Sequence, residues 1–210
     1  YEADMVTSIE EEIAIVTEAQ EGIENHEFRI YVQPQCDISG EQTRIVGAEC
    51  LVRWFHDGKE VMGPGRFVPV LEKNGFISEL DRFIWRQACI WLRNWMDQGH
   101  IPVPLSVNVS RLDIVSMDVP EYFIQLTTEY QIRPQLLKIE ITEGVYAENN
   151  EKVNLTVKQL LDAGFAVLMD DFGSGYSSLN MLKDVAVNAL KLDMRFLDID
   201  AEKHNEKKGK

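Results

Sequence analysis

Cysteine is scarce in this sequence, and long apolar runs are absent. Cys36, Cys50 and Cys89 form no C-x-x-C pair and have no histidine nearby at ligand spacing, which disfavours a disulfide framework or a zinc site. No apolar stretch reaches the roughly 18 residues of a membrane span, and no signal-peptide pattern opens the chain. We therefore expect reduced thiols and a cytoplasmic location, as a cytosolic protein or as the cytosolic part of a larger, membrane-anchored one.

Basic residues are also in short supply. The sequence has 21 Lys and Arg against 35 Asp and Glu, a formal net charge of -14. A nucleic-acid polymer needs clustered Lys and Arg along one face, so this class of partner is excluded. A small anionic ligand is not excluded, provided that metal ions stand between it and the carboxylates. The 45% of hydrophobic and 27% of charged residues are typical of a globular domain.

Apolar periodicity predicts strands that alternate with helices along the chain. The predicted strands are 28–32, 45–54, 105–109, 137–142, 165–169 and 189–192. The predicted helices are 8–23, 78–98, 118–130, 150–163 and 177–183, with a further short helix ending near residue 75. Pro34 should end the first strand, Ser78 should cap the long helix, and Trp85, Trp91 and Trp95 should lie in the core.

This alternation predicts parallel pairing with right-handed crossovers, in a doubly wound sheet or a (β/α)8 barrel. No G-x-G-x-x-G follows a strand, so a dinucleotide-binding fold loses its best support. A complete barrel has eight strands, and about six are recognisable here.

Polar residues interrupt the apolar strands near their C-terminal ends, where parallel α/β folds build their sites. These residues are Glu49, Asn108, Glu140, Asp170 with Asp171, and Lys191. Converging carboxylates and an amide oxygen suit Mg²⁺ or Mn²⁺, and adjacent aspartates allow one carboxylate to bridge two ions. Any one acid could instead form a structural ion pair, and Arg53 is a candidate partner for Glu49.

With these residues in view, the chain resembles the EAL-domain family of cyclic di-GMP phosphodiesterases. Glu49-Cys50-Leu51 followed by Val52-Arg53 matches the signature, with cysteine in place of the usual alanine. Further matches, in order, are YVQPQ at 31–35, SVNVS at 106–110, EITE at 140–143, DDFGSGYSSL at 170–179 and LKLD at 190–193. The resemblance covers residues 26–198.

The resemblance implies a TIM-barrel-like (β/α)8 fold with one antiparallel strand, taken to be 28–32, and hydrolysis of cyclic di-GMP to linear pGpG. It implies two Mg²⁺ or Mn²⁺ ions and assigns the site residues one by one. The first ion would be held by Glu49, Asn108, Glu140 and Asp170, the second by Asp170 and Asp171. Lys191 would orient or deprotonate the attacking water, with Asp171 and Glu49 also catalytic. Gln33, Leu51, Arg53 and Asp193 would contact substrate, and Glu143 would anchor the loop from Phe172 to Tyr176, which links metal binding to a dimer contact.

After Asp193 the pattern departs from the family, because a further metal-associated Glu and a Gln do not follow. We therefore expect an incomplete domain at 26–198 that lacks its last two βα units, preceded by a connector helix at 1–25 and followed by a polar tail at 199–210. The absent Met at residue 1 indicates a piece of a longer protein, with a diguanylate cyclase-like or sensory domain upstream, and we expect a homodimer.

Little or no turnover is expected of this chain by itself, and hydrolysis is expected of the full-length parent. The alternatives are a catalytically inactive receptor that binds cyclic di-GMP, or another two-metal barrel hydrolase, against which the matches at Gln33 and Arg53 speak.

Overall fold

The computed structural model describes residues 2–147, 151–173 and 186–194, and in them a single curled sheet forms the framework. The strands are β1 (Phe28–Asp37), β2 (Arg44–His56), β3 (Lys59–Met62), β4 (Leu105–Asn108), β5 (Leu137–Thr142), β6 (Ala166–Phe172) and β7 (Ala189–Leu192). Their order is β1-β2-β4-β5-β6-β7, with β3 paired to β2. β1 and β3 run antiparallel to β2, and the other neighbours are parallel. The predicted α/β architecture with an antiparallel first strand is confirmed.

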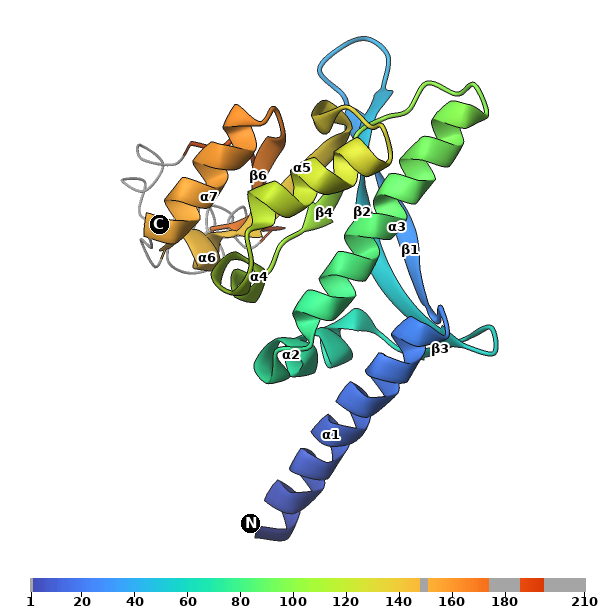
Figure 1. Cartoon of the computed structure of the whole chain (residues 1–210), viewed down its shortest axis with the longest axis vertical. Coiled ribbons are helices and arrows are strands. Elements are labelled where there is room, and N and C mark those ends of the chain that lie inside the picture. The colour runs from blue at the N-terminus through green and yellow to red at the C-terminus, as the bar shows by residue number, and fades with distance from the viewer. Residues whose placement is uncertain (1, 148–150, 174–185, 195–210) are drawn as a thin grey trace, which may run out of the picture.

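Helices cover one side of this sheet. They are α1 (Glu2–Glu24), α2 (Pro64–Asn74), α3 (Ile77–Asp97), α4 (Arg111–Ser116), α5 (Val119–Glu129), α6 (Glu143–Ala147) and α7 (Glu151–Asp162), with a 3₁₀ turn at Pro134–Leu136. In Figure 1, α3, α5 and α7 lie in front of the strands while α1 projects away from the body toward the N-terminus. None of the helices in the described ranges has the length and apolar content needed to cross a membrane.

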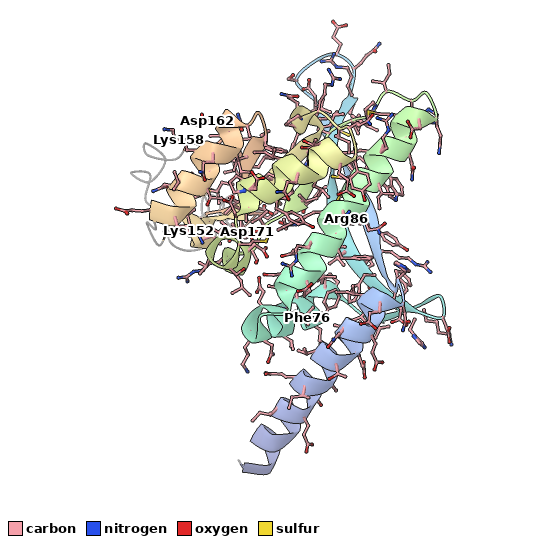
Figure 2. All side chains as sticks on the ribbon, viewed as in Figure 1. Phe76, Arg86, Lys152, Lys158, Asp162 and Asp171 are labelled. Atoms are coloured by element: carbon pink, nitrogen blue, oxygen red, sulfur yellow. The ribbon has the colours of Figure 1, made fainter. Side chains whose placement is uncertain are left out.

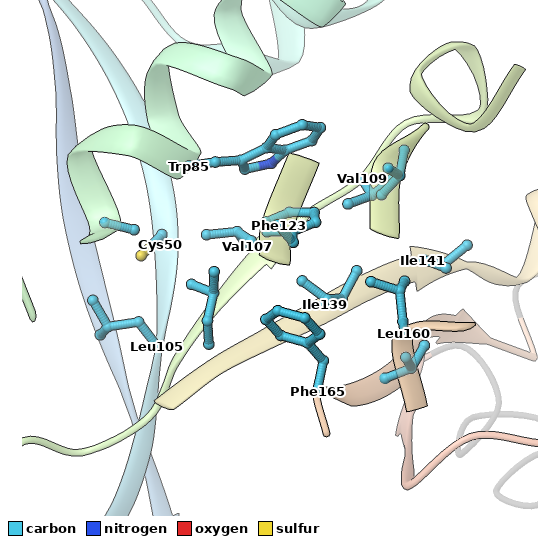
Figure 3. Packing of buried hydrophobic residues seen from close by; sticks show 14 of the residues in the cluster. Cys50, Trp85, Leu105, Val107, Val109, Phe123, Ile139, Ile141, Leu160 and Phe165 are labelled. Carbon is cyan, nitrogen blue, oxygen red and sulfur yellow. The ribbon is translucent and has the colours of Figure 1, made fainter. Parts of the chain in front are cut away.

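The core lies between the sheet and these helices. Strand residues such as Val107 and Ile139 meet Trp85 of α3, Phe123 of α5 and Leu160 of α7, as Figure 3 shows. Successive strand residues point to opposite faces, so the residues between these apolar ones point away from the helices. The packing therefore sends the polar strand positions to the uncovered face of the sheet.

The first strand does not end at Pro34, contrary to the prediction, but continues to Asp37. Pro34 stands opposite Ala48, whose N–H donates to the carbonyl of Pro104 on the other side of β2 (2.9 Å). Pro34 therefore occupies a position that gives no hydrogen bond to β2, and its missing N–H costs the ladder nothing.

Three predictions about helices were wrong in detail. α1 begins at Glu2 rather than at Ser8, and the N-cap of α3 is Phe76, so Ser78 lies inside the first turn. Trp85 is fully buried, but Trp91 is 46% exposed. Six residues make about one and two-thirds helical turns, which carries Trp91 away from the face of Trp85. The predicted helix at 177–183 lies outside the described residues.

A pair of aspartates, Asp81 and Asp113, joins α3 to α4. Ser110 caps α4, because its hydroxyl oxygen accepts a hydrogen bond from the N–H of Asp113 (3.2 Å). In return its own N–H and hydroxyl donate to Asp113 Oδ2 (2.8 and 2.7 Å). Asp113 Oδ1 is buried and, in the described part of the chain, has no hydrogen-bond donor. Burial, together with the charge of Asp113 and the hydrogen bond to it, raises the pKa of Asp81 well above its usual range. A protonated Asp81 therefore supplies the donor that Asp113 lacks.

We expect Asp81→Asn to stabilise the protein at alkaline pH. A raised folded-state pKa means that the unfolding free energy falls as pH rises from about 4, the unfolded value, through the folded pKa. Asparagine donates the same hydrogen bond without ionising, so the variant should gain about 1 kcal/mol at pH 8, or about 2–4 °C in Tm. Thermal unfolding between pH 5 and 9 tests this, with the exposed Asp162→Asn as control. Parallel pH profiles for wild type and Asp81→Asn would contradict it.

Candidate active site

Three carboxylates from three strands meet on the face of the sheet that lies opposite the described helices. Glu49 on β2, Glu140 on β5 and Asp170 on β6 each place one carboxylate oxygen within 4.8 Å of the others. Asn108 on β4 is the register neighbour of Glu140, and its carbonyl accepts a hydrogen bond from the Trp85 indole (2.9 Å). Residues from four separate strands therefore converge because the parallel register aligns their ends.

Lys191 on β7 lies at the centre of this cluster. Its Nζ donates to Glu49 Oε2 (2.8 Å), Glu140 Oε2 (2.6 Å) and Asp170 Oδ2 (2.9 Å). The ion pair considered between Glu49 and Arg53 does not form, since the Arg53 guanidinium donates to the carbonyl of Val52 (2.9 Å).

The charges in the cluster do not balance, which leaves room for a cation. Burial raises the pKa of Glu140, against the lowering effect of Lys191. Burial alone would lower the pKa of Lys191, but hydrogen bonds to Glu140, Glu49 and Asp170 outweigh it and raise that pKa. One ammonium thus faces three carboxylates, so two negative charges remain uncompensated among the described residues.

An orphaned oxygen points to the same conclusion. Glu140 Oε1 is buried without a hydrogen bond of normal geometry among the described residues. The Ser106 hydroxyl lies close enough to the Glu140 carboxylate to lower its pKa, but it donates to the carbonyl of Ala48 (3.4 Å). A buried carboxylate oxygen in this state is costly unless a cation or a donor reaches it. An all-oxygen set with excess negative charge fits a divalent ion such as Mg²⁺ or Mn²⁺.

A β-bulge explains how two consecutive aspartates fit at the end of β6. Met169 pairs with Leu190 and Phe172 with Leu192, so Asp170 and Asp171 both stand opposite the single residue Lys191. Asp171 has a φ of 56°, and its N–H donates to Asp170 Oδ1 (2.9 Å). A regular strand would send the two side chains to opposite faces, whereas a bulge re-aims one of them. Figure 2 labels Asp171, on the side of the molecule with α4, α6 and α7.

Glu143 braces the chain that leaves β6. It is the first residue of α6, only 2% exposed, and its Oε2 accepts a hydrogen bond from the N–H of Gly173 (2.9 Å). Gly173 has a φ of 94°, a conformation that favours glycine. The structure therefore brings Glu143 against the start of the predicted loop, while residues 174–176 lie outside the described part.

The expected substrate-contacting residues lie on or beside the strands that carry the carboxylates and Lys191. Gln33 stands directly opposite Glu49 in the β1–β2 ladder. Leu51 and Arg53 line a cavity of about 350 Å³ together with Asn108. Asp193 follows β7, where its N–H donates to the carbonyl of Phe172 (3.0 Å).

The cysteine in the signature takes no part in the site. Cys50 lies in the core, and burial, with the nearby charges of Glu140 and Glu49, raises the pKa of its thiol to about 12. All three cysteines are free, in agreement with the expected reduced thiols.

Several residues near the site were not predicted as site residues. Asp81 lines the same cavity as Arg53, and Arg29, Tyr31 and Phe55 lie beside Arg53 on the β1–β2 ladder. Alternate residues of a strand share a face. Counting back along β1 from Gln33 in steps of two could therefore have placed Tyr31 and Arg29 on the same face as Gln33.

Comparisons with known proteins agree with this geometry. The family model described as "EAL domain" matches residues 16–209. The chain is 33% identical over 185 residues to signaling protein YkoW of Bacillus subtilis, covering 88% of this chain and 23% of that protein. It is 27% identical over 198 residues to the bifunctional diguanylate cyclase/cyclic di-GMP phosphodiesterase MucR of Pseudomonas aeruginosa, covering 94% of this chain and 29% of that protein.

A solved structure shares the fold. The structure described as "PaMucR Phosphodiesterase, c-di-GMP complex" superposes with a TM-score of 0.79 at 28% identity, covering 90% of this chain and 75% of that one. The chain spans less than a third of the length of the two curated relatives. With the barrel-like sheet, the strand-end carboxylates and the family model in agreement, this chain belongs to the EAL domain family.

Proposed function

We propose that this chain belongs to a cyclic di-GMP phosphodiesterase domain that, in the full-length protein, hydrolyses one phosphodiester bond to give linear pGpG. The convergence of Glu49, Glu140 and Asp170 around a site with two uncompensated negative charges carries the proposal. Membership of the family supports it, as does the relative that was solved in complex with cyclic di-GMP.

We further propose two Mg²⁺ or Mn²⁺ ions. The first would be held by Glu49, Asn108, Glu140 and Asp170, and the second by Asp170 and Asp171. When bound, such ions lower the pKa of water and stabilise the charge on the leaving oxygen. The orphaned Glu140 Oε1 and the bulge that places both aspartates opposite Lys191 support this assignment.

The protein groups would bind and orient the reactants. Lys191, an ammonium beside all three carboxylates, would hold the attacking water by a hydrogen bond. Arg53 would contact substrate, since its charge is not paired with a carboxylate in the described part of the chain. Gln33, Leu51 and Asp193 would complete the contacts to substrate, and Glu143 would hold the start of the loop at Gly173 in place.

The organisation of the whole protein is proposed on similar grounds. Residues 26–198 would form the EAL domain and 1–25 a connector, because α1 projects from the body and the relatives are several times longer. MucR is named as bifunctional, which supports an upstream diguanylate cyclase-like or sensory domain. The free cysteines support a cytoplasmic location. A homodimer remains part of the proposal.

Incubation with cyclic di-GMP tests the function directly. We expect chromatography to detect pGpG from the full-length protein when Mg²⁺ or Mn²⁺ is present, little or none from this chain alone, and no product after the ions are removed with EDTA. Calorimetric titration of cyclic di-GMP separates binding from cleavage. Binding without pGpG would identify a receptor rather than an enzyme, and the absence of both would overturn the proposal.

A further inference from the structure

The face of the β1–β2 ladder that carries Glu49 continues beyond the carboxylates. In the antiparallel register, Gln33 pairs with Glu49, Tyr31 with Leu51 and Arg29 with Arg53. The alternate residues Phe28 and Trp54 pack against the helices on the other face. Arg29, Tyr31 and Arg53 therefore extend the face of the active site toward the carboxyl end of β2.

Two arginines stand directly opposite each other on this face. Like charges in opposed positions of an antiparallel pair destabilise the sheet. In the described ranges neither Arg29 nor Arg53 forms an ion pair with a carboxylate, although the chain carries 35 acidic residues. Two arginines without carboxylate partners at the edge of a site suit an electron-rich ligand, because each guanidinium group can donate two parallel hydrogen bonds to such an acceptor.

Aromatic rings hold these arginines apart. The Arg29 guanidinium carbon lies 5.0 Å from the Phe55 ring centroid, and that of Arg53 lies 5.9 Å from the Tyr31 centroid. The Phe55 and Tyr31 rings are stacked, with centroids 5.9 Å apart and an interplanar angle of 10°. Tyr31 is 49% exposed. The four side chains form a continuous ladder, Arg29–Phe55–Tyr31–Arg53, which we call the arginine–aromatic ladder.

We propose that the arginine–aromatic ladder is a guanine-binding subsite for the end of the substrate that lies away from the metal-binding carboxylates. This inference rests on the proposed function and adds Arg29, Tyr31 and Phe55 to the residues that contact substrate. Exposed aromatic rings stack on nucleobases, and arginine donates to guanine O6 and N7. Four residues of strand, about 13 Å, separate Arg53 from Glu49 along β2, which places the ladder beside the carboxylates but distinct from them.

Affinity for cyclic di-GMP, measured by calorimetry with Ca²⁺ present, tests the subsite. We expect Tyr31→Leu and Arg29→Gln each to weaken binding about tenfold, because a stacked base and a paired hydrogen bond are lost. Tyr31→Phe keeps the ring and should stay within about twofold of wild type. Arg44→Gln is the matched control, because Arg44 is an exposed arginine at the opposite end of the same hairpin, paired with Asp37 (3.2 Å).

A second titration, with Mn²⁺ alone, guards against a general disturbance of the site. The affinity for Mn²⁺ should be unchanged in Tyr31→Leu and Arg29→Gln, because neither residue touches the carboxylates. Variants that bind cyclic di-GMP like wild type, or that lose Mn²⁺ affinity in parallel, would overturn the subsite while the proposed function stands. A wild-type protein that does not bind cyclic di-GMP would overturn the proposed function and the subsite with it.

Discussion

Asp170→Asn in the full-length protein is expected to abolish metal-dependent cleavage of cyclic di-GMP, lowering kcat by about three orders of magnitude, since metal-ion catalysis contributes several kcal/mol. Asp170 is the carboxylate shared by both proposed ions, and it also accepts hydrogen bonds from Lys191 and from the N–H of Asp171. The two bonds go to different oxygens, Oδ2 and Oδ1, so the single amide oxygen of asparagine keeps only one of them, and the site loses one negative charge. Chromatographic detection of pGpG measures the loss.

Asp57→Asn is the matched control for this variant. Asp57 is almost fully exposed in the turn between β2 and β3, and asparagine tolerates its positive φ of 47° as well as aspartate does. Its cleavage rate and its Mn²⁺ affinity should equal those of wild type, whereas Asp170→Asn should also bind Mn²⁺ more weakly. Cleavage retained by Asp170→Asn would contradict the assignment of this cluster as the metal site.

The convergence of Glu49, Glu140, Asp170 and Lys191 could be predicted because it depends on a general property of parallel sheets. Each residue interrupts an apolar run near the end of its strand, and such ends meet at one edge. The sequence pattern shows where each strand ends and which polar residue lies there, so the exact register is not needed. The position of Asn108 could be predicted by the same reasoning.

The bulge at Asp170 and Asp171 could not be predicted in the same way. Whether two consecutive residues oppose one or two partners depends on the register with β7, which lies 21 residues away in the sequence from Asp170 to Lys191. Local propensity does not determine such long-range pairing. The extension of β1 past Pro34 was missed for a related reason, since it depends on which way the hydrogen bonds of Ala48 point.

The arginine–aromatic ladder shows a third limit. Its members come from both strands of a hairpin, and no short motif joins Arg29 to Phe55. A register slip of one residue would send Arg29 to the helix-covered face and break the ladder, so the ladder exists only in the observed pairing.

Lys191→Met is expected to change cleavage and metal affinity in opposite directions. Loss of the group that holds the attacking water should lower kcat by about a hundredfold or more, the contribution usual for positioned proton donors and acceptors. Mn²⁺ should nevertheless bind more tightly, because the Lys191 ammonium contacts the same three carboxylates that would hold the first ion. Calorimetric titration of Mn²⁺ and a cleavage assay measure the two effects separately.

The stability of the metal-free protein gives the third observable for Lys191→Met. Without an ammonium, Glu49, Glu140 and Asp170 repel one another, and Glu140 is fully buried. With EDTA present we expect an unfolding free energy lower by about 2 kcal/mol, or a Tm lower by about 4–8 °C, restored by Mn²⁺. Lys191→Arg keeps the positive charge, so it should show neither the loss of stability nor the tighter Mn²⁺ binding. Weaker Mn²⁺ binding in Lys191→Met would mean that the lysine supports the ion site rather than competing with the ion for its carboxylates.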